Sequence, residues 1–170
     1  MKSTSSAAVA CGFLLCLTSM AWAQFAAEEP EWKESEVPLP PLVEMSRLVN
    51  FEVSPNASLV YGVDPVSISI SKSDGVVRYV VVASNATGAR NVMYEGIRCA
   101  TGEFKTYARY SSEGPWNMVN KPQWQTMFGN MPSKHALRLA AAGVCDNAVP
   151  TASVREIVSR LKNPNFRITN

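Results

Sequence analysis

The side chains that most often carry out nucleophilic and acid–base chemistry are few in this chain. It contains one histidine, His135, and three aspartates, Asp64, Asp74 and Asp146. A Ser-His-Asp triad needs all three residue types in contact, but Asp74 precedes a glycine in a pair typical of turns, and no Gly-x-Ser-x-Gly elbow is present. We therefore assign no catalytic residue and expect a protein that is not an enzyme. A hydrolase that uses His135 with a nearby serine or with Glu95 is the runner-up.

Residues that bind metals or phosphates are also scarce. A zinc site needs several His or Cys ligands, and if Cys99 bonds to Cys145 only His135 remains. Neither a Walker loop nor Gly-x-Gly-x-x-Gly occurs. We expect no metal and no cofactor. The formal net charge of +2 is much smaller than the excess of basic residues typical of nucleic-acid-binding proteins, so we expect no nucleic-acid partner.

Glu95 and Arg98 are the first candidates for ligand binding. They belong to the block Tyr94-Glu95-Gly96-Ile97-Arg98-Cys99, whose glycine indicates a bulge or a close backbone approach. In a strand, alternation puts Glu95 on the face of Cys99 and Arg98 on the opposite face. We expect a partly buried Glu95 carboxylate, paired with a base such as Arg78 or Arg109. An ion pair that stabilises the sheet is favoured over a ligand-binding role.

Trp116, Trp124 and His135 complete the candidate binding residues. Two tryptophans on an irregular connection could form a groove for a glycan, a peptide or another small molecule. Side chains of this kind more often cover the open edge of a small sheet. We favour packing and keep the groove as an alternative.

The first 23 residues have the pattern of a secretory signal peptide. Lys2 is the only charge before Glu28, and the apolar run 7–17 is too short to span a bilayer. Small residues at Ala21 and Ala23 predict cleavage after Ala23. A lipoprotein signal is disfavoured because Leu15, rather than a small residue, precedes Cys16. A retained N-terminal anchor helix is the alternative to a cleaved product without a transmembrane span.

Cleavage would leave two cysteines, Cys99 and Cys145. In an oxidising compartment two such cysteines usually pair, and the cross-link would stabilise the fold by at most roughly 4 kcal/mol. Two free buried thiols are the alternative. Because they form no Cys-x-x-Cys pair, a thioredoxin-like role is disfavoured.

The mature chain is predicted to be an extended lead-in followed by one domain. Residues 24–45 are rich in Glu and Pro and have little apolar surface to bury, although Trp32 and Leu39 could lie against the domain. Residues 46–170 are long enough for a single α+β domain with its own core.

The centre of that domain has the patterns of an antiparallel meander of about five strands. Val66, Ile68 and Ile70 alternate with serines, which predicts a strand with these three residues on its dry face. The Asp74-Gly75 pair predicts a hairpin turn. Further strands are predicted at 76–83, which is apolar enough for burial on both faces, at 91–99, at 103–110, and earlier near Phe51 or over 59–63.

Two C-terminal helices are predicted to pack on this sheet, stapled to it by the disulfide. A long irregular connection after Ser111 leads to a helix over 134–144 that ends near Gly143 and has one apolar face, made of Leu137, Ala140, Ala141 and Val144. The next helix has Val154, Ile157, Val158 and Leu161 at helical spacing. Thr151, or Ser153 with Glu156, signals its start, and Asn163-Pro164 its end.

Several of these residues together resemble the cryptic neisserial protein-like family. The similar positions are the stretch 74–79, the stretch 88–92, the block 94–99, Tyr107, Ala108, Trp116, Trp124, His135, Leu137 and Cys145. The family typically has an acidic–aromatic pair before the second cysteine, where this chain has Gly143-Val144. The resemblance implies an envelope protein of Gram-negative type and supplies no activity or ligand residues.

We therefore expect an exported accessory or binding protein of the periplasm, with association with the outer membrane as an alternative. Its partner would be an unidentified envelope protein or a glycan. The sequence indicates neither the identity of that partner nor the oligomeric state.

Overall fold

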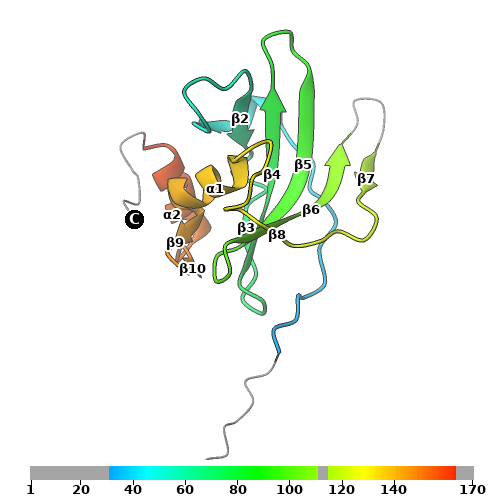
Figure 1. Ribbon diagram of the computed structural model, residues 1–170, viewed down its shortest axis with the longest axis vertical. Helices are drawn as coiled ribbons and strands as arrows, with labels where there is room; N and C mark the ends of the chain where they lie inside the picture. The colour runs from blue at the N-terminus through cyan, green and yellow to red at the C-terminus, as the bar shows by residue number, and fades with distance from the viewer. Residues whose placement is uncertain (1–30, 111–114, 164–170) are drawn as a thin grey trace, which may run out of the picture. The chain divides into compact units, whose positions relative to one another are not determined.

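The computed structural model describes residues 31–110 and 115–163 (Figure 1). One compact unit begins at Trp32. The predicted signal peptide, its cleavage site at Ala23 and the first part of the lead-in lie outside the described residues.

The described strands form a large antiparallel sheet. Its path is β1 (Val49–Phe51), β2 (Val60–Val63), β4 (Val76–Ser84), β5 (Arg90–Arg98), β6 (Glu103–Tyr110) and β7 (Trp116–Met118). Off this path, β3 (Ser69–Ile70) pairs with β4, and β8 (Gln125–Thr126) pairs with β6. The α+β class is confirmed, but the described sheet has eight strands rather than about five, partly because β7 and β8 occupy the connection that we expected to be irregular.

The central strands are those that the sequence marked most clearly. Residues 76–83 are buried at every position, as a strand covered on both faces requires. The turn at Asp74-Gly75 joins β3 to β4, and both early strands that we considered are present, as β1 and β2.

The strand predicted from the alternation at Val66, Ile68 and Ile70 is wrong for most of its length. Only 69–70 pair with β4, and Val66 is 71% exposed. The cause is Asp64, which closes a turn: its main-chain oxygen accepts hydrogen bonds from the backbone N–H and the hydroxyl of Ser67. That buried hydroxyl also accepts from Val80 N, so the serine at this position points inward.

Helices cover one face of the sheet. They are α1 (His135–Leu139), the π-helical turn η2 (Ala140–Val144) and α2 (Val154–Leu161), and Figure 1 shows α1 and α2 together beside β4. Of the residues expected on the apolar face of the first segment, Ala140 and Val144 are buried and Ala141 is exposed. The other buried positions are His135, Ala136, Leu139 and Gly143. In α2 the N-cap is Ser153, whose Oγ accepts from Glu156 N.

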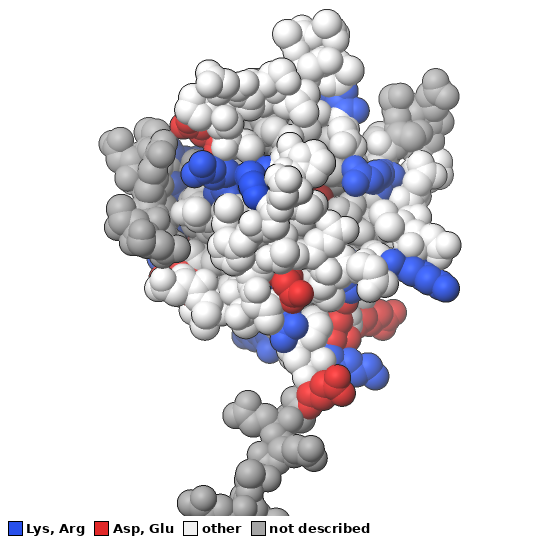
Figure 2. Space-filling model, viewed as in Figure 1, with Lys and Arg blue, Asp and Glu red and all other residues white. Residues whose placement is uncertain are grey.

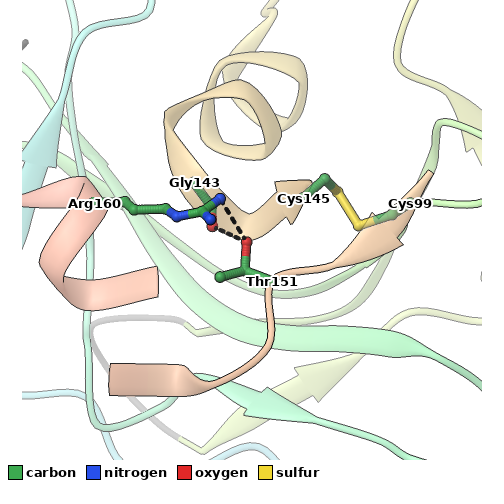
Figure 3. Close-up of a disulfide and its surroundings, with 5 residues drawn as sticks. All are labelled: Cys99, Gly143, Cys145, Thr151 and Arg160. Atoms are coloured by element: carbon green, nitrogen blue, oxygen red, sulfur yellow. Dashed lines mark hydrogen bonds between the residues drawn. A yellow bond between two sulfur atoms is a disulfide. The ribbon is translucent and has the colours of Figure 1, made fainter. Parts of the chain in front are cut away.

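The disulfide joins the helical layer to the sheet. Cys99 follows β5, and Cys145 follows η2 and begins the short pair β9 (Cys145–Asp146) and β10 (Val149–Pro150) (Figure 3). Gly143, where the first helical segment ends, has a φ of +136°, and a Cβ there would lie 2.6 Å from Cβ of Arg160. The hydroxyl of Thr151 donates to the Gly143 carbonyl oxygen, so Thr151 stabilises this end instead of starting α2.

A segment that we call the strap, residues 32–44, covers the opposite face. It leads into the short 3₁₀ helix η1 (Met45–Arg47), and Val37 and Val43 pack on a second cluster, made of Val80, Val82, Val92, Tyr94, Tyr107 and Ala108. Leu39 does not pack: it is 87% exposed, and Leu42 is 85% exposed. Prolines at 38, 40 and 41 hold this part of the strap extended, so both leucines point away from the sheet.

The strap is held at its start by buried charged groups. The indole of Trp32 donates to the main-chain oxygen of Asp74, and both N and Oγ of Ser35 donate to the Asp74 carboxylate. Burial alone would raise the pKa of Asp74, but hydrogen bonds from Arg78, Ser35 and Ser71 outweigh it and hold that pKa well below its usual range. Asp74 is therefore an anchor for the strap as well as a turn residue.

Glu34 is the second anchor of the strap. Its carboxylate forms an ion pair with Lys105, accepts a hydrogen bond from the Tyr107 hydroxyl at 2.6 Å, and lies 3.6 Å from Nη2 of Arg78. Arg78 and Lys105 are almost fully buried, so this carboxylate neutralises charge that water cannot reach.

We expect Glu34→Gln to lower the free energy of unfolding by about 2 kcal/mol, because it leaves buried cations with one anion fewer. Glu36→Gln, an exposed glutamate of the same strap, is the control and should stay within about 0.5 kcal/mol of the wild type. Urea unfolding measures both. Equal effects of the two substitutions would show that Glu34 does not anchor the strap.

Candidate functional site

Glu95 is fully buried beneath the helical layer. Its side chain points to the face that α1 covers and accepts three hydrogen bonds: from Thr106 Oγ1 at 3.0 Å, from the Tyr79 hydroxyl at 3.2 Å and from Nε2 of His135 at 2.8 Å. Burial first, and then the neighbouring Glu95 carboxylate, raises the pKa of Tyr79 well above its usual value, so the phenol remains a donor.

The expected partner of Glu95 was wrong. Arg78 lies opposite Gly96 in the β4–β5 ladder and faces the strap, where it pairs with Asp74 at 2.8 Å. Arg109 is exposed near the end of β6 and bonds to Asn91. The base that meets Glu95 comes instead from α1, 40 residues further along the chain. The carboxylate is also fully buried, not partly buried as expected.

His135 lies between two aromatic rings at the start of α1. Its imidazole stacks on Tyr61, with the ring planes 5° apart, and meets Phe104 edge-on. Only 7% of the residue is exposed. The ring is therefore held in one orientation, with Nε2 toward Glu95 and Nδ1 toward Ser133, two residues before it in the chain.

Ser133 completes a chain of hydrogen bonds. Its Oγ lies 3.1 Å from Nδ1 of His135 and 2.9 Å from the Tyr61 hydroxyl, and it accepts from the backbone N–H of His135. In the tautomer that carries its proton on Nε2, His135 donates to the Glu95 carboxylate and its Nδ1 accepts from the Ser133 hydroxyl. Each member of the series Tyr61, Ser133, His135 and Glu95 is thereby satisfied.

A bulge in the sheet makes room for this arrangement. The pairing of β5 with β6 shifts between Tyr94 and Glu95, so Tyr94 lies opposite Ala108 and Glu95 opposite Thr106. The extra residue, Tyr107, points to the strap, while Thr106 reaches Glu95. The glycine of this block fits the close approach that we expected, because a Cβ on Gly96 would lie 2.5 Å from the Tyr107 hydroxyl.

A pocket of about 490 Å³ opens above Glu95 and His135. Strands β5 and β6 form one wall, and the connection from Val119 to Ser133 forms the other. Its apolar lining includes Leu59, Met93, Phe104 and Met131, and its polar lining includes Thr106, Arg109, Lys121, Gln123, Gln125 and Ser133. A larger cavity of about 770 Å³ between β1 and α2 is lined by none of the candidate residues.

The remaining candidate residues lie away from this pocket. Arg98 stacks over the Trp32 ring, with its guanidinium carbon 3.8 Å from the centroid. Trp124 makes a T-shaped contact with Trp32, and Trp116 packs against Tyr94 and Tyr110. The structure thus brings Glu95 and His135 together and places Arg98 and Trp124 beside the strap and Trp116 in the second cluster.

Sequence reasoning missed several residues of the site. Tyr61, Thr106 and Ser133 were not singled out, because a hydroxyl in a strand or loop carries no spacing signal of its own. Ser133 had the best signal, since it stands two residues before the single histidine. Among the described residues, no cluster of His, Cys, Asp and Glu side chains is arranged to hold a metal ion.

We expect His135→Phe to lower the free energy of unfolding by about 3 kcal/mol, because the ring shape is kept while the buried Glu95 loses a donor. Glu95→Leu should be destabilising as well. The double variant should be more stable than the sum of the two effects predicts by at least about 1 kcal/mol, since no unpaired charge is left. Additive effects in urea unfolding would contradict a coupled pair.

Comparison with known proteins supplies a family and no relative of known activity. A family model described as CNP1-like family matches residues 27–162. No curated protein and no solved structure matches the chain.

Proposed function

Since the chain belongs to the CNP1-like family, which carries no assigned activity, we propose from the site itself that it is an exported, non-enzymatic binding protein. It would act in the periplasm or at the envelope and hold its ligand in the pocket above Glu95 and His135. The narrower relationship to cryptic neisserial proteins, and with it a Gram-negative envelope origin, is part of this proposal.

The observation that carries the proposal is the pocket on its rigid polar floor. A carboxylate and an imidazole at the bottom of a partly apolar pocket, each held by several hydrogen bonds, are typical of a preorganised binding site. The covering helix cannot slide without breaking the His135–Glu95 pair, so the pocket keeps its shape before a ligand enters.

Export is supported by the first 23 residues and by the disulfide, which is typical of oxidising compartments. In the described part of the chain, none of the helices has the length and apolar character needed to cross a membrane.

We expect the full chain, produced in a Gram-negative host, to be found in the periplasmic fraction and to begin at Gln24. N-terminal sequencing and fractionation measure this. A chain that keeps its first 23 residues and sediments with membranes would instead support the retained anchor.

Pocket binding is tested with a fragment library and ligand-observed NMR. We expect hits on the mature protein that disappear in Gln125→Trp, because Gln125 lines the pocket and a large ring there would block it. Thr126→Trp is the matched control: it is the next residue of β8, equally exposed and not part of the lining. Hits that survive Gln125→Trp, or no hits at all, would contradict the proposed site.

A hydrolase is the second candidate, favoured by the order Ser133, His135 and Glu95. In such a reaction Ser133 Oγ bonds to a carbonyl carbon, its proton passes through His135 to the leaving group, and water then releases the acid. The burial of His135 and the three hydrogen-bonding contacts of Ser133 Oγ argue against a free nucleophile. A fluorophosphonate probe that adds mass to the mature protein, but not to Ser133→Ala, would support the hydrolase over the binding protein.

A glycan groove built by Trp116 and Trp124 is the weakest alternative. Their rings belong to separate clusters, and neither lines the pocket.

A further inference from the structure

Two cations stand among the lining residues of the pocket without an acidic partner. Arg109 comes from β6, and its Nη1 donates to the neutral side-chain oxygen of Asn91 at 3.4 Å. Lys121 comes from the connection after β7 and is exposed. Among the described residues no carboxylate lies within ion-pair distance of either cation. Figure 2 shows positively charged side chains over the far end of β6 on this face.

The backbone at Lys121 is held in an uncommon conformation. Its φ is +50°, in the left-handed region that residues with a side chain seldom adopt, and its carbonyl oxygen accepts from the Gln123 side chain at 3.1 Å. Such a conformation persists where the surroundings enforce it, and it is concentrated at ligand-binding sites. The lysine is thus presented at the lining by a defined turn.

The lining contains a single acidic residue, Glu95. Glu95 lies at the floor and its two oxygens already accept from Thr106, Tyr79 and His135. The lining also includes the apolar side chains of Met93, Phe104 and Met131. A ligand that fits these features has an apolar body and one negative charge at its end.

We propose that the pocket binds a small monocarboxylate with an apolar body. This inference rests on the proposed function and adds the chemical class of its ligand. The carboxylate is held by Arg109 and Lys121, and the body lies against Phe104, Met93 and Met131. The volume of about 490 Å³ lies within the usual range for small-molecule sites.

Three probes of equal chain length separate charge from apolar contact: octanoate, octanamide and octylammonium. Titration calorimetry on the mature protein should give a dissociation constant for octanoate at least about tenfold lower than for octanamide, and no binding of octylammonium. Raising the salt concentration should weaken the binding of octanoate and leave the binding of octanamide unchanged.

Variants then test whether Arg109 and Lys121 bind the carboxylate of octanoate. Arg109→Gln with Lys121→Gln should remove the advantage of octanoate over octanamide while octanamide still binds. Arg155→Gln, an exposed arginine on α2 outside the lining, is the matched control and should change nothing.

Each outcome is decisive. If octanamide binds as tightly as octanoate and Gln125→Trp abolishes both, the pocket binds ligands but the inference about charge is overturned. If none of the three probes binds while the fragment library gives pocket hits, the ligand class is overturned and the proposed function stands. If octanoate binds equally to Gln125→Trp, it binds elsewhere, and both proposals are overturned.

Discussion

The structure depends on the need to give polar or charged partners to the charged side chains that its two central strands bury. Glu95 on β5 and Arg78 on β4 lie on opposite faces of the same pair of strands, and neither is accessible to water. Leaving one such charge without a partner would remove several kcal/mol from a total stability of about 5 to 15 kcal/mol. Two partners come from distant parts of the chain: His135 from α1 on one face, and the strap residue Glu34 on the other. A third partner, Asp74, is only four residues before Arg78. The two outer layers are thereby held in register with the sheet.

The strands and helices could be predicted because their signals are local. The apolar run at 76–83, the turn at Asp74-Gly75 and the spacing of Ile157 and Leu161 in α2 each report a neighbourhood of a few residues. The serine alternation at 66–71 failed for the opposite reason. There, Asp64 offers the backbone a competing set of hydrogen bonds, so the chain turns where periodicity alone indicates a strand.

The site could be predicted only in part. Alternation correctly put Glu95 on the covered face, and the glycine beside it correctly indicated a close approach at Tyr107. The partner of Glu95 was not predictable, because the two bases that we expected there, Arg78 and Arg109, are directed elsewhere by strand register and by the bulge. Which residue of a later helix reaches a given strand is set by packing over the whole domain. The packing of the strap on the sheet was not predictable either, since its Glu and Pro content is also typical of a free tether.

The bond between Cys99 and Cys145 closes a covalent ring that contains most of the pocket. The two cysteines have Cα atoms 5.7 Å apart. The lining residues that lie between them in the sequence include Phe104, Thr106, Arg109, Lys121, Ser133 and His135. If α1 lifts away from the sheet, its departure is limited by the ring, and the effective concentration of the helix near its docking surface stays high. The disulfide therefore keeps the pocket walls beside the helix that covers them, so contacts between them that break locally re-form without the rest of the fold coming apart.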